Sequence, residues 1–292
     1  MTTAVYYRHS GASPMNGIMT GLTLAVCAGA VLGAVYGIID FYSPIIYLNV
    51  VAVCGAGAAT GAALRTCLRI GKVRNNGYTL LIGLIAGVVA LYGSWVTWLA
   101  ALTEWEVILV SPLDIVPFAQ ILAIDGVWEM KGTTPTGAGL YSIWGIEALL
   151  LIGFTIAIAR ADPIPFCEAC DVWTDPLDVT FVFPSRTLVL LKQDLESGDG
   201  NGVIKLFGED VDAADFLKIS THTCPLCTDS NYVKVEQVTT NAKDETSTKQ
   251  KIAWIGVEMS TVEALQELLV EPAPQAETFD PSELEMDDDQ TA

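Results

Sequence analysis

The sequence predicts an α-helical four-span membrane bundle followed by a small α+β cytoplasmic domain. Three observations carry this prediction. The first is a set of four apolar runs within residues 1–160, each about 20 residues long, the length that crosses a bilayer as a helix. The second is charge: residues 161–292 carry 8 of the 15 basic and 27 of the 34 acidic residues, and hence the whole formal charge of −19. The third is a pair of Cys-x-x-Cys motifs within this acidic half.

These shifts in composition also define the expected domains. A short cytoplasmic amino-terminus, residues 1–16, precedes the transmembrane domain, residues 17–160. A zinc-binding α+β domain follows over residues 161–271. The Pro- and acid-rich segment 272–292 is predicted to be a disordered tail. The first apolar run is too long for the apolar part of a signal peptide, so we expect no removed signal.

We expect spans at residues 17–39, 44–64, 79–102 and 140–159. Small residues recur at every fourth position in the first two spans, and such a stripe lets membrane helices approach closely. Only the segment 40–43 separates these two spans, so they should form a tight antiparallel hairpin. The glycines predicted to lie at helix contacts are Gly21, Gly29, Gly33, Gly37, Gly57 and Gly61.

Basic residues predict the orientation of the bundle. The segment 65–74, between the second and third spans, is the most basic stretch of the chain. The positive-inside rule places such a short basic loop in the cytoplasm. Four spans then put both termini in the cytoplasm, and the expected location is the inner or plasma membrane of the cell. The cytoplasm keeps thiols reduced, so the cysteine pairs would be free to bind a metal ion.

Residues 103–138 are expected to form an outer loop that contains one short helix. Ser111 should cap this helix, with Pro112 at its first position and Asp114 in its first turn. We interpret it as an amphipathic helix lying at the outer membrane surface. A re-entrant segment is the alternative. A fifth span over residues 107–124 would instead place the cysteines outside the cell.

Two polar residues, Asn49 and Glu147, lie inside the predicted spans. An acid inside a membrane helix is a functional-site hypothesis by default, because a charge facing lipid is costly. The alternative, given equal weight, is that Glu147 is an acid that packs between helices and reaches water. The helical rise places the two residues at depths of about 8 and 10 Å. We therefore expect both to face the bundle interior at one level, with Ser94 or Thr97 as neighbours.

The two cysteine pairs carry the main site prediction. A Cys-x-x-Cys turn directs two thiolates to one side, and two such turns complete a closed tetrahedral zinc site. The pairs lie 53 residues apart, far more than the roughly 15–20 residues of a simple ribbon, so a subdomain should be inserted between them. Thioredoxin-like redox motifs use a single pair, and two pairs of free thiols are the other alternative. The predicted zinc ligands are Cys167, Cys170, Cys224 and Cys227.

These two knuckles resemble the zinc-ribbon group of small metal-stapled domains. The resemblance covers the four cysteines and the strands beside the second pair. It implies a structural Zn²⁺ and often an interaction surface. The helices inserted between the knuckles depart from a simple ribbon, and no named family covers the whole chain.

Hydrophobic patterning predicts the remaining elements of the acidic half. Helices are expected over residues 185–197, 203–208 and 261–270, and strands over residues 216–221, 232–239 and 251–257. The segment 198–202 has the composition of a calcium loop but lacks the closing glutamate, which favours a plain turn. His222 precedes Cys224 by two residues, and we interpret it as a strand residue because four cysteines already fill a zinc shell.

The expected function is that of an integral membrane protein that presents a structural-zinc cytoplasmic domain for protein–protein interaction. The alternative is a small transporter or channel component that uses Glu147. An enzyme is less expected, because the sequence lacks the common catalytic fingerprints. The acidic charge disfavours nucleic acid as a partner. The expected partners are the lipid bilayer and a protein bound by the cytoplasmic domain, and a homo-oligomer is left open.

Overall fold

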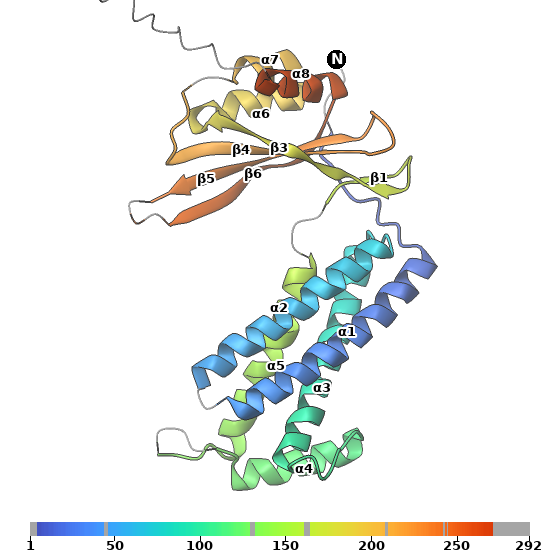
Figure 1. Ribbon diagram of the computed structural model, residues 1–292, viewed down its shortest axis with the longest axis vertical. Helices are drawn as coiled ribbons and strands as arrows, with labels where there is room; N and C mark the ends of the chain where they lie inside the picture. Colours follow the sequence, from blue (N-terminus) through green and yellow to red (C-terminus); the bar gives the residue numbers. More distant parts are fainter. Residues whose placement is uncertain are drawn as a thin grey trace, which may run out of the picture. The chain divides into compact units, whose positions relative to one another are not determined.

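The computed structural model describes residues 5–43, 46–128, 132–160, 164–207, 210–241, 243 and 245–270. The chain forms two compact units (Figure 1). The helical unit comprises His9–Pro163, and the sheet unit comprises Met1–Arg8 together with Ile164–Ala292. The acidic tail predicted over residues 272–292 lies outside the described residues.

The described residues of the helical unit form five helices: α1 (Met15–Tyr42), α2 (Ile46–Ile70), α3 (Asn76–Leu102), α4 (Pro112–Asp125) and α5 (Gly137–Arg160). Within the described residues, the four helices α1, α2, α3 and α5 are long and apolar enough to cross a membrane. The four predicted long helices are thus confirmed. The largest difference is at the end of α2, which continues past the predicted limit at residue 64 to Ile70.

Glycine contacts define the directions of the long helices. Between α1 and α3, the residue numbers of both partners increase from one contact to the next, in the pairs Gly29–Ala86, Gly33–Ala90 and Gly37–Ser94. The residue numbers of both partners also increase together between α2 and α5, in the pairs Gly57–Leu151 and Gly61–Thr155. A Cβ atom on any of these glycines would lie within 2.7 Å of a carbonyl oxygen of the neighbouring helix, so only glycine permits this spacing. The helices of each pair therefore run parallel.

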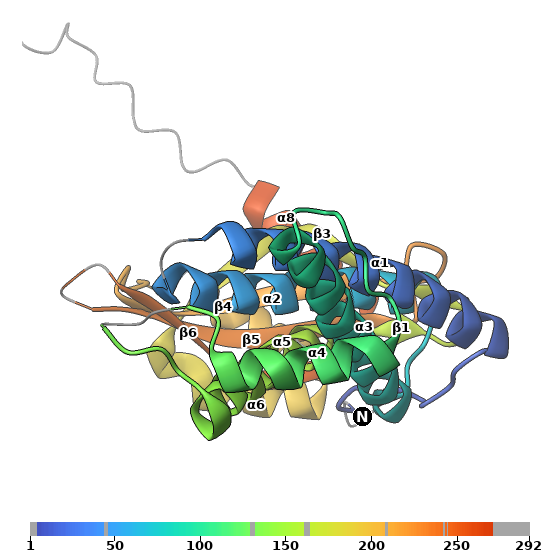
Figure 2. The same ribbon diagram turned by 90° about the horizontal axis from the view of Figure 1, so that it is seen from below.

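The segment between α3 and α5 does not cross the bundle. Gly83 contacts Ile156 and Gly87 contacts Ile152, so α3 and α5 run antiparallel. A further crossing between them would have made them parallel. Figures 1 and 2 show α4 lying across one end of the bundle.

The end signals of α4 act as the sequence predicts. The hydroxyl of Ser111 accepts a hydrogen bond of 3.2 Å from the backbone N–H of Leu113, and Pro112 occupies the first turn. Gly126 ends the helix with a φ of +79°, a left-handed conformation that favours glycine. Ile115 and Ala123 are buried, whereas Leu113, Val116, Ile121 and Ile124 are exposed.

The sheet unit is built on a four-stranded antiparallel sheet with the strand order β3-β4-β5-β6. The strands are β3 (Asp175–Pro184), β4 (Asp215–Thr223), β5 (Asn231–Thr240) and β6 (Thr246–Val257). One face of the sheet is covered by the helices α6 (Leu188–Ser197), α7 (Gly200–Lys205) and α8 (Met259–Val270) (Figure 1). A separate two-stranded sheet pairs β1 (Phe166–Cys167) with β2 (Val172–Trp173).

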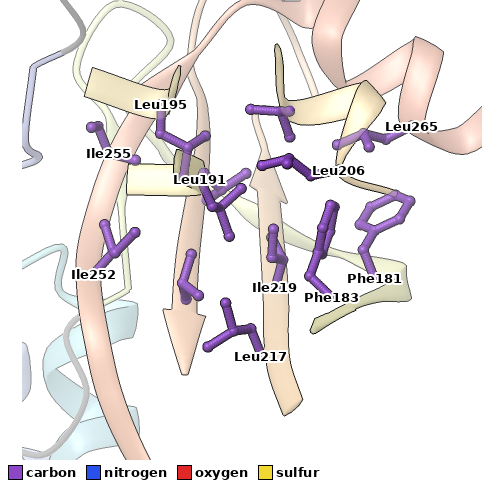
Figure 3. Packing of buried hydrophobic residues seen from close by; sticks show 13 residues of the cluster. Phe181, Phe183, Leu191, Leu195, Leu206, Leu217, Ile219, Ile252, Ile255 and Leu265 are labelled. Carbon is purple, nitrogen blue, oxygen red and sulfur yellow. The ribbon is translucent and has the colours of Figure 1, made fainter. Parts of the chain in front are cut away.

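The core of the sheet unit lies between this sheet and its helices (Figure 3). Alternate residues of β4, Leu217 and Ile219, are buried because successive side chains of a strand point to opposite faces. The helices add Leu191, Leu195 and Leu265 to the same cluster. Such burial of apolar surface is the main stabilising contribution to the unit.

Most elements predicted in the acidic half are present, with several differences. The strands β1, β2 and β3 were not predicted, and the helix expected over residues 203–208 is α7, which ends at Lys205. The predicted turn at residues 198–202 is shorter, because the Asp199 side chain accepts a 3.1 Å hydrogen bond from the N–H of Gly202 and caps α7 from Gly200 onward. The strand β6 begins at Thr246, five residues earlier than expected, because its exposed polar half continues the backbone pairing with β5.

Candidate metal centre

The first knuckle is the tight turn that joins β1 to β2. Cys167 pairs with Val172 and Phe166 with Trp173, so the two short strands close the turn that carries Cys170. Asp171 completes this turn in the left-handed backbone conformation, with a φ of +55°. Local pairing thus brings both sulfurs of this motif to one place.

The second knuckle connects β4 to β5. The pair Thr223–Asn231 is the last of the ladder between these strands, so the loop that follows is held at its base. The N–H of Cys224 donates a 3.0 Å hydrogen bond to the carbonyl of Ser230. The N–H of Leu226 donates a 3.4 Å hydrogen bond to the sulfur of Cys224.

The two knuckles meet, and their four sulfur atoms lie within 4.8 Å of one another. The sulfurs of Cys167 and Cys227 are 3.7 Å apart, far beyond the length of a disulfide bond. Four thiolates placed about 2.3 Å from a tetrahedral zinc ion would be separated by about 3.8 Å. The cluster can therefore hold a metal ion through Cys167, Cys170, Cys224 and Cys227.

The electrostatics of the cluster also favour a bound cation. Burial opposes ionisation of Cys167, but the hydrogen bond from Ser230, 3.2 Å long, and those from Cys170 and Cys224 lower its pKa to about 7. The hydrogen bond with Cys227 and burial raise the pKa of Cys170 to about 12. The thiolate form of Cys167 is thus stabilised, while ionisation of the Cys170 thiol is opposed. A divalent cation would supply the charge that lets all four thiols ionise.

Comparison with protein-family models, curated proteins and solved structures gives no match to this chain. The function proposed below accordingly rests on the geometry of the site.

His222 lies apart from the four sulfurs. Its ring packs edge-on against Trp254 at a centroid distance of 4.7 Å, and its Nδ1 atom lies 3.3 Å from the hydroxyl of Thr174. Among the described residues, the grouped metal-ligating side chains do not include it. Its position on β4 agrees with the prediction of a strand residue.

The structure gives Glu147 a hydrogen-bond partner that the sequence did not predict. The hydroxyl of Tyr36 on α1 donates a 2.8 Å hydrogen bond to Glu147 on α5. The Oδ1 atom of Asn49 is buried and has no hydrogen-bond partner among the described residues. Ser94 and Thr97 donate instead to backbone carbonyls of α1 and α3.

The register of α2 and α5 explains why Asn49 does not contact Glu147. Gly57 lies opposite Leu151 and Gly61 opposite Thr155, and the same offset places Val53 opposite Glu147. Asn49 is therefore one helical turn away. Counting depth from the expected helix ends could not show this offset, because it depends on which glycine contacts which backbone.

Ser230 and Tyr7 were also missed as parts of the site. Ser230 donates to the sulfur of Cys167, and the hydroxyl of Tyr7 accepts a 3.0 Å hydrogen bond from the N–H of Phe166 beside it. The position of Ser230, three residues after Cys227, was a usable signal for a donor to the knuckle. No pattern in the sequence around Tyr7 indicated that it contacts the cysteine cluster region.

Proposed function

We propose that this chain is an integral membrane protein whose sheet unit is a cytoplasmic domain held together by a structural Zn²⁺ ion and used for protein–protein interaction. The observation that carries the proposal is the cluster of four sulfurs within 4.8 Å. Four thiolates leave no open coordination position, which is typical of a structural zinc site rather than a catalytic one. Soft sulfur ligands in a tetrahedron favour zinc over magnesium or calcium.

Two features support a four-span membrane topology. The segment Val5–Arg8 belongs to the same unit as residues 164–270, as an even number of crossings requires. The start of α1 and the basic loop also lie at the same end of the bundle, because Gly17 contacts Gly71 and the N–H of Arg74 donates to the carbonyl of Ala12. The positive-inside rule assigns this end, and hence the sheet unit, to the cytoplasm.

Charge and exposed apolar side chains support a protein partner. The acidic half carries the whole formal charge of −19, which disfavours nucleic acid and anionic lipid headgroups. The surface of the sheet unit also exposes Val189 and Leu190 on α6 and Leu226 in the second knuckle. A partner that pairs basic side chains with an apolar contact fits this surface.

Metal analysis of the purified full-length chain tests the zinc site. We expect one zinc per chain in the wild type and a loss of zinc in Cys224→Ser. The matched control is Cys27→Ser, because Cys27 is an exposed residue of α1 and should leave the zinc content unchanged. A wild-type chain purified without zinc, and unable to bind it on addition, would remove the basis of the proposal. Affinity capture with the zinc-loaded chain then identifies the partner.

A small transporter or channel component is the second candidate. It is favoured by the hydrogen bond from Tyr36, which orients Glu147 toward the bundle interior. Ion or solute flux through liposomes that contain the protein would support it, provided that Glu147→Gln abolishes the flux. Flux that is unchanged in this variant would assign Glu147 a packing role.

A further inference from the structure

The described residues Val5–Tyr7 form an isolated β-bridge on the edge of β6. The N–H of Tyr7 donates a 2.8 Å hydrogen bond to the carbonyl of Trp254, and the N–H of Gly256 donates a 3.1 Å hydrogen bond to the carbonyl of Val5. Tyr6 lies opposite Ile255 in antiparallel register. The segment Val5–Tyr7 thus extends the four-stranded sheet beyond β6.

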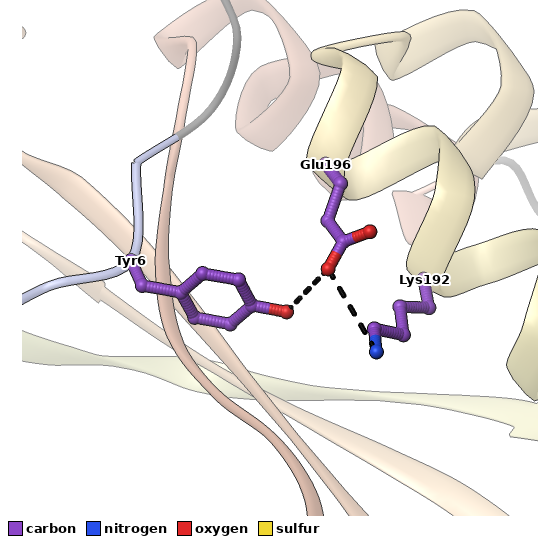
Figure 4. Close-up of polar contacts among 3 residues, drawn as sticks. All are labelled: Tyr6, Lys192 and Glu196. Carbon is purple, nitrogen blue, oxygen red and sulfur yellow. Dashed lines mark hydrogen bonds and ion pairs between the residues drawn. The ribbon is translucent and has the colours of Figure 1, made fainter.

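The two tyrosines of this segment contact different parts of the sheet unit. The hydroxyl of Tyr6 donates a 2.7 Å hydrogen bond to Glu196 on α6, which also pairs with Lys192 at 3.8 Å (Figure 4). Tyr7 follows it in the strand, and successive strand residues point to opposite faces. Its ring accordingly packs edge-on against Tyr232 at a centroid distance of 5.0 Å.

Both contacts of Tyr7 lie next to the cysteine cluster. Its hydroxyl accepts a hydrogen bond from the N–H of Phe166. Phe166 is only 1% exposed and immediately precedes Cys167. Tyr232 lies two residues after Ser230, whose hydroxyl donates to the sulfur of Cys167. Tyr7 therefore contacts the two segments that a metal ion bound by the four cysteines would join.

We propose that Val5–Tyr7 is a metal-coupled latch, which docks on β6 when the four cysteines hold Zn²⁺ and is released when they do not. The proposal rests on the zinc site proposed above. Metal binding and docking of the latch favour the same arrangement of the two knuckles, so each must strengthen the other by the same factor. The chain passes from the sheet unit to the helical unit between Arg8 and His9, and α1 begins at Met15. Zinc occupancy would thereby determine whether the start of α1 is tied to the sheet unit.

The test compares the Zn²⁺ affinity of full-length protein in nanodiscs, measured by competition with a chromophoric chelator. Tyr7→Phe removes only the hydroxyl that accepts the hydrogen bond from the buried N–H of Phe166, so we expect the affinity to fall about tenfold. Tyr47→Phe is the matched control, because Tyr47 is 72% exposed on α2 and lies outside the latch. Its affinity should stay within about twofold of the wild type.

Hydrogen exchange of the zinc-saturated proteins provides a second readout. In Tyr7→Phe, the amides of residues 5–8 and of Gly256 should exchange about tenfold faster than in the wild type, while those of β4 keep their protection. Wild-type zinc affinity in Tyr7→Phe, or equal losses in Tyr47→Phe and Tyr7→Phe, would overturn the latch and leave the zinc site intact. If the wild type itself binds no zinc, the zinc site and the latch fail together.

Discussion

The hydroxyl of Tyr36 on α1 donates a hydrogen bond of 2.8 Å to the carboxylate of Glu147 on α5. Tyr36 is 2% exposed, and both residues lie in helices long enough to cross a membrane. A carboxylate at membrane depth would need a hydrogen-bond donor, because water is scarce there and lipid offers none. This pair links the first and last of the four long helices.

Removal of that hydroxyl should weaken the helical unit. Tyr36→Phe is expected to lower the free energy of unfolding by about 1–2 kcal/mol, since interhelical hydrogen bonds in membranes contribute about that much. Thermal unfolding of the full-length protein in detergent micelles measures the change. Tyr47→Phe is the control, because Tyr47 is 72% exposed and its change should stay within about 0.5 kcal/mol. Equal stability of the two variants would show that the pair contributes nothing.

Zinc is expected to hold the sheet unit together. Four-thiolate binding contributes about 10–16 kcal/mol in small zinc peptides, comparable to or above the 5–15 kcal/mol of a whole domain. Cys224→Ser should therefore unfold the unit rather than weaken one contact. Hydrogen exchange of β5 reports this directly, with Cys27→Ser as the control on an exposed cysteine of α1. A strand that stays protected in strong chelator would contradict the prediction.

The glycine contacts between helices should be intolerant of a side chain. A Cβ on Gly33 would meet the carbonyl of Ala90, whereas a Cβ on Gly55 would meet nothing within 4 Å. Gly33→Ala is expected to destabilise the helical unit by about 1–3 kcal/mol, the usual effect of overpacking. Gly55→Ala should be neutral or slightly stabilising. Denaturation of both variants in micelles measures the difference, and similar midpoints would refute the role assigned to Gly33.

Reporter fusions check the proposed topology. Fusions after Asn76, Lys131 and Ala292 should report the inside, the outside and the inside of the cell, respectively, because the basic loop is expected in the cytoplasm. Each reporter should be inserted into an otherwise unchanged chain, and expression levels serve as the control. An outside signal at Ala292 would mean an odd number of crossings.

Local properties of the chain made much of this fold predictable. The four long helices were found because apolar length is read directly from the residues. The ends of α4 were found because Ser111, Pro112 and Gly126 act through their nearest neighbours. The cysteine cluster was found because the Cys-x-x-Cys spacing already pairs two sulfurs within one turn.

Features that depend on distant contacts were not predictable in this way. The offset between α2 and α5 separates Asn49 from Glu147, and it depends on contacts such as Gly57 with Leu151. The strand β3 begins at Asp175-Pro176 and ends at Pro184, residues that are rare inside sheets but tolerated at an edge. The alternation of buried Phe181 and Phe183 was the signal that could have identified it.

The β-bridge on the edge of β6 has a consequence for synthesis. Val5 and Tyr7 are made before the four long helices, whereas their partners Gly256 and Trp254 are made after them. The segment Val5–Tyr7 can therefore form this bridge only after the intervening helices have been made. A chain cut short before residue 254 has no place for this segment. Docking of this segment consequently reports that the chain has been made as far as β6.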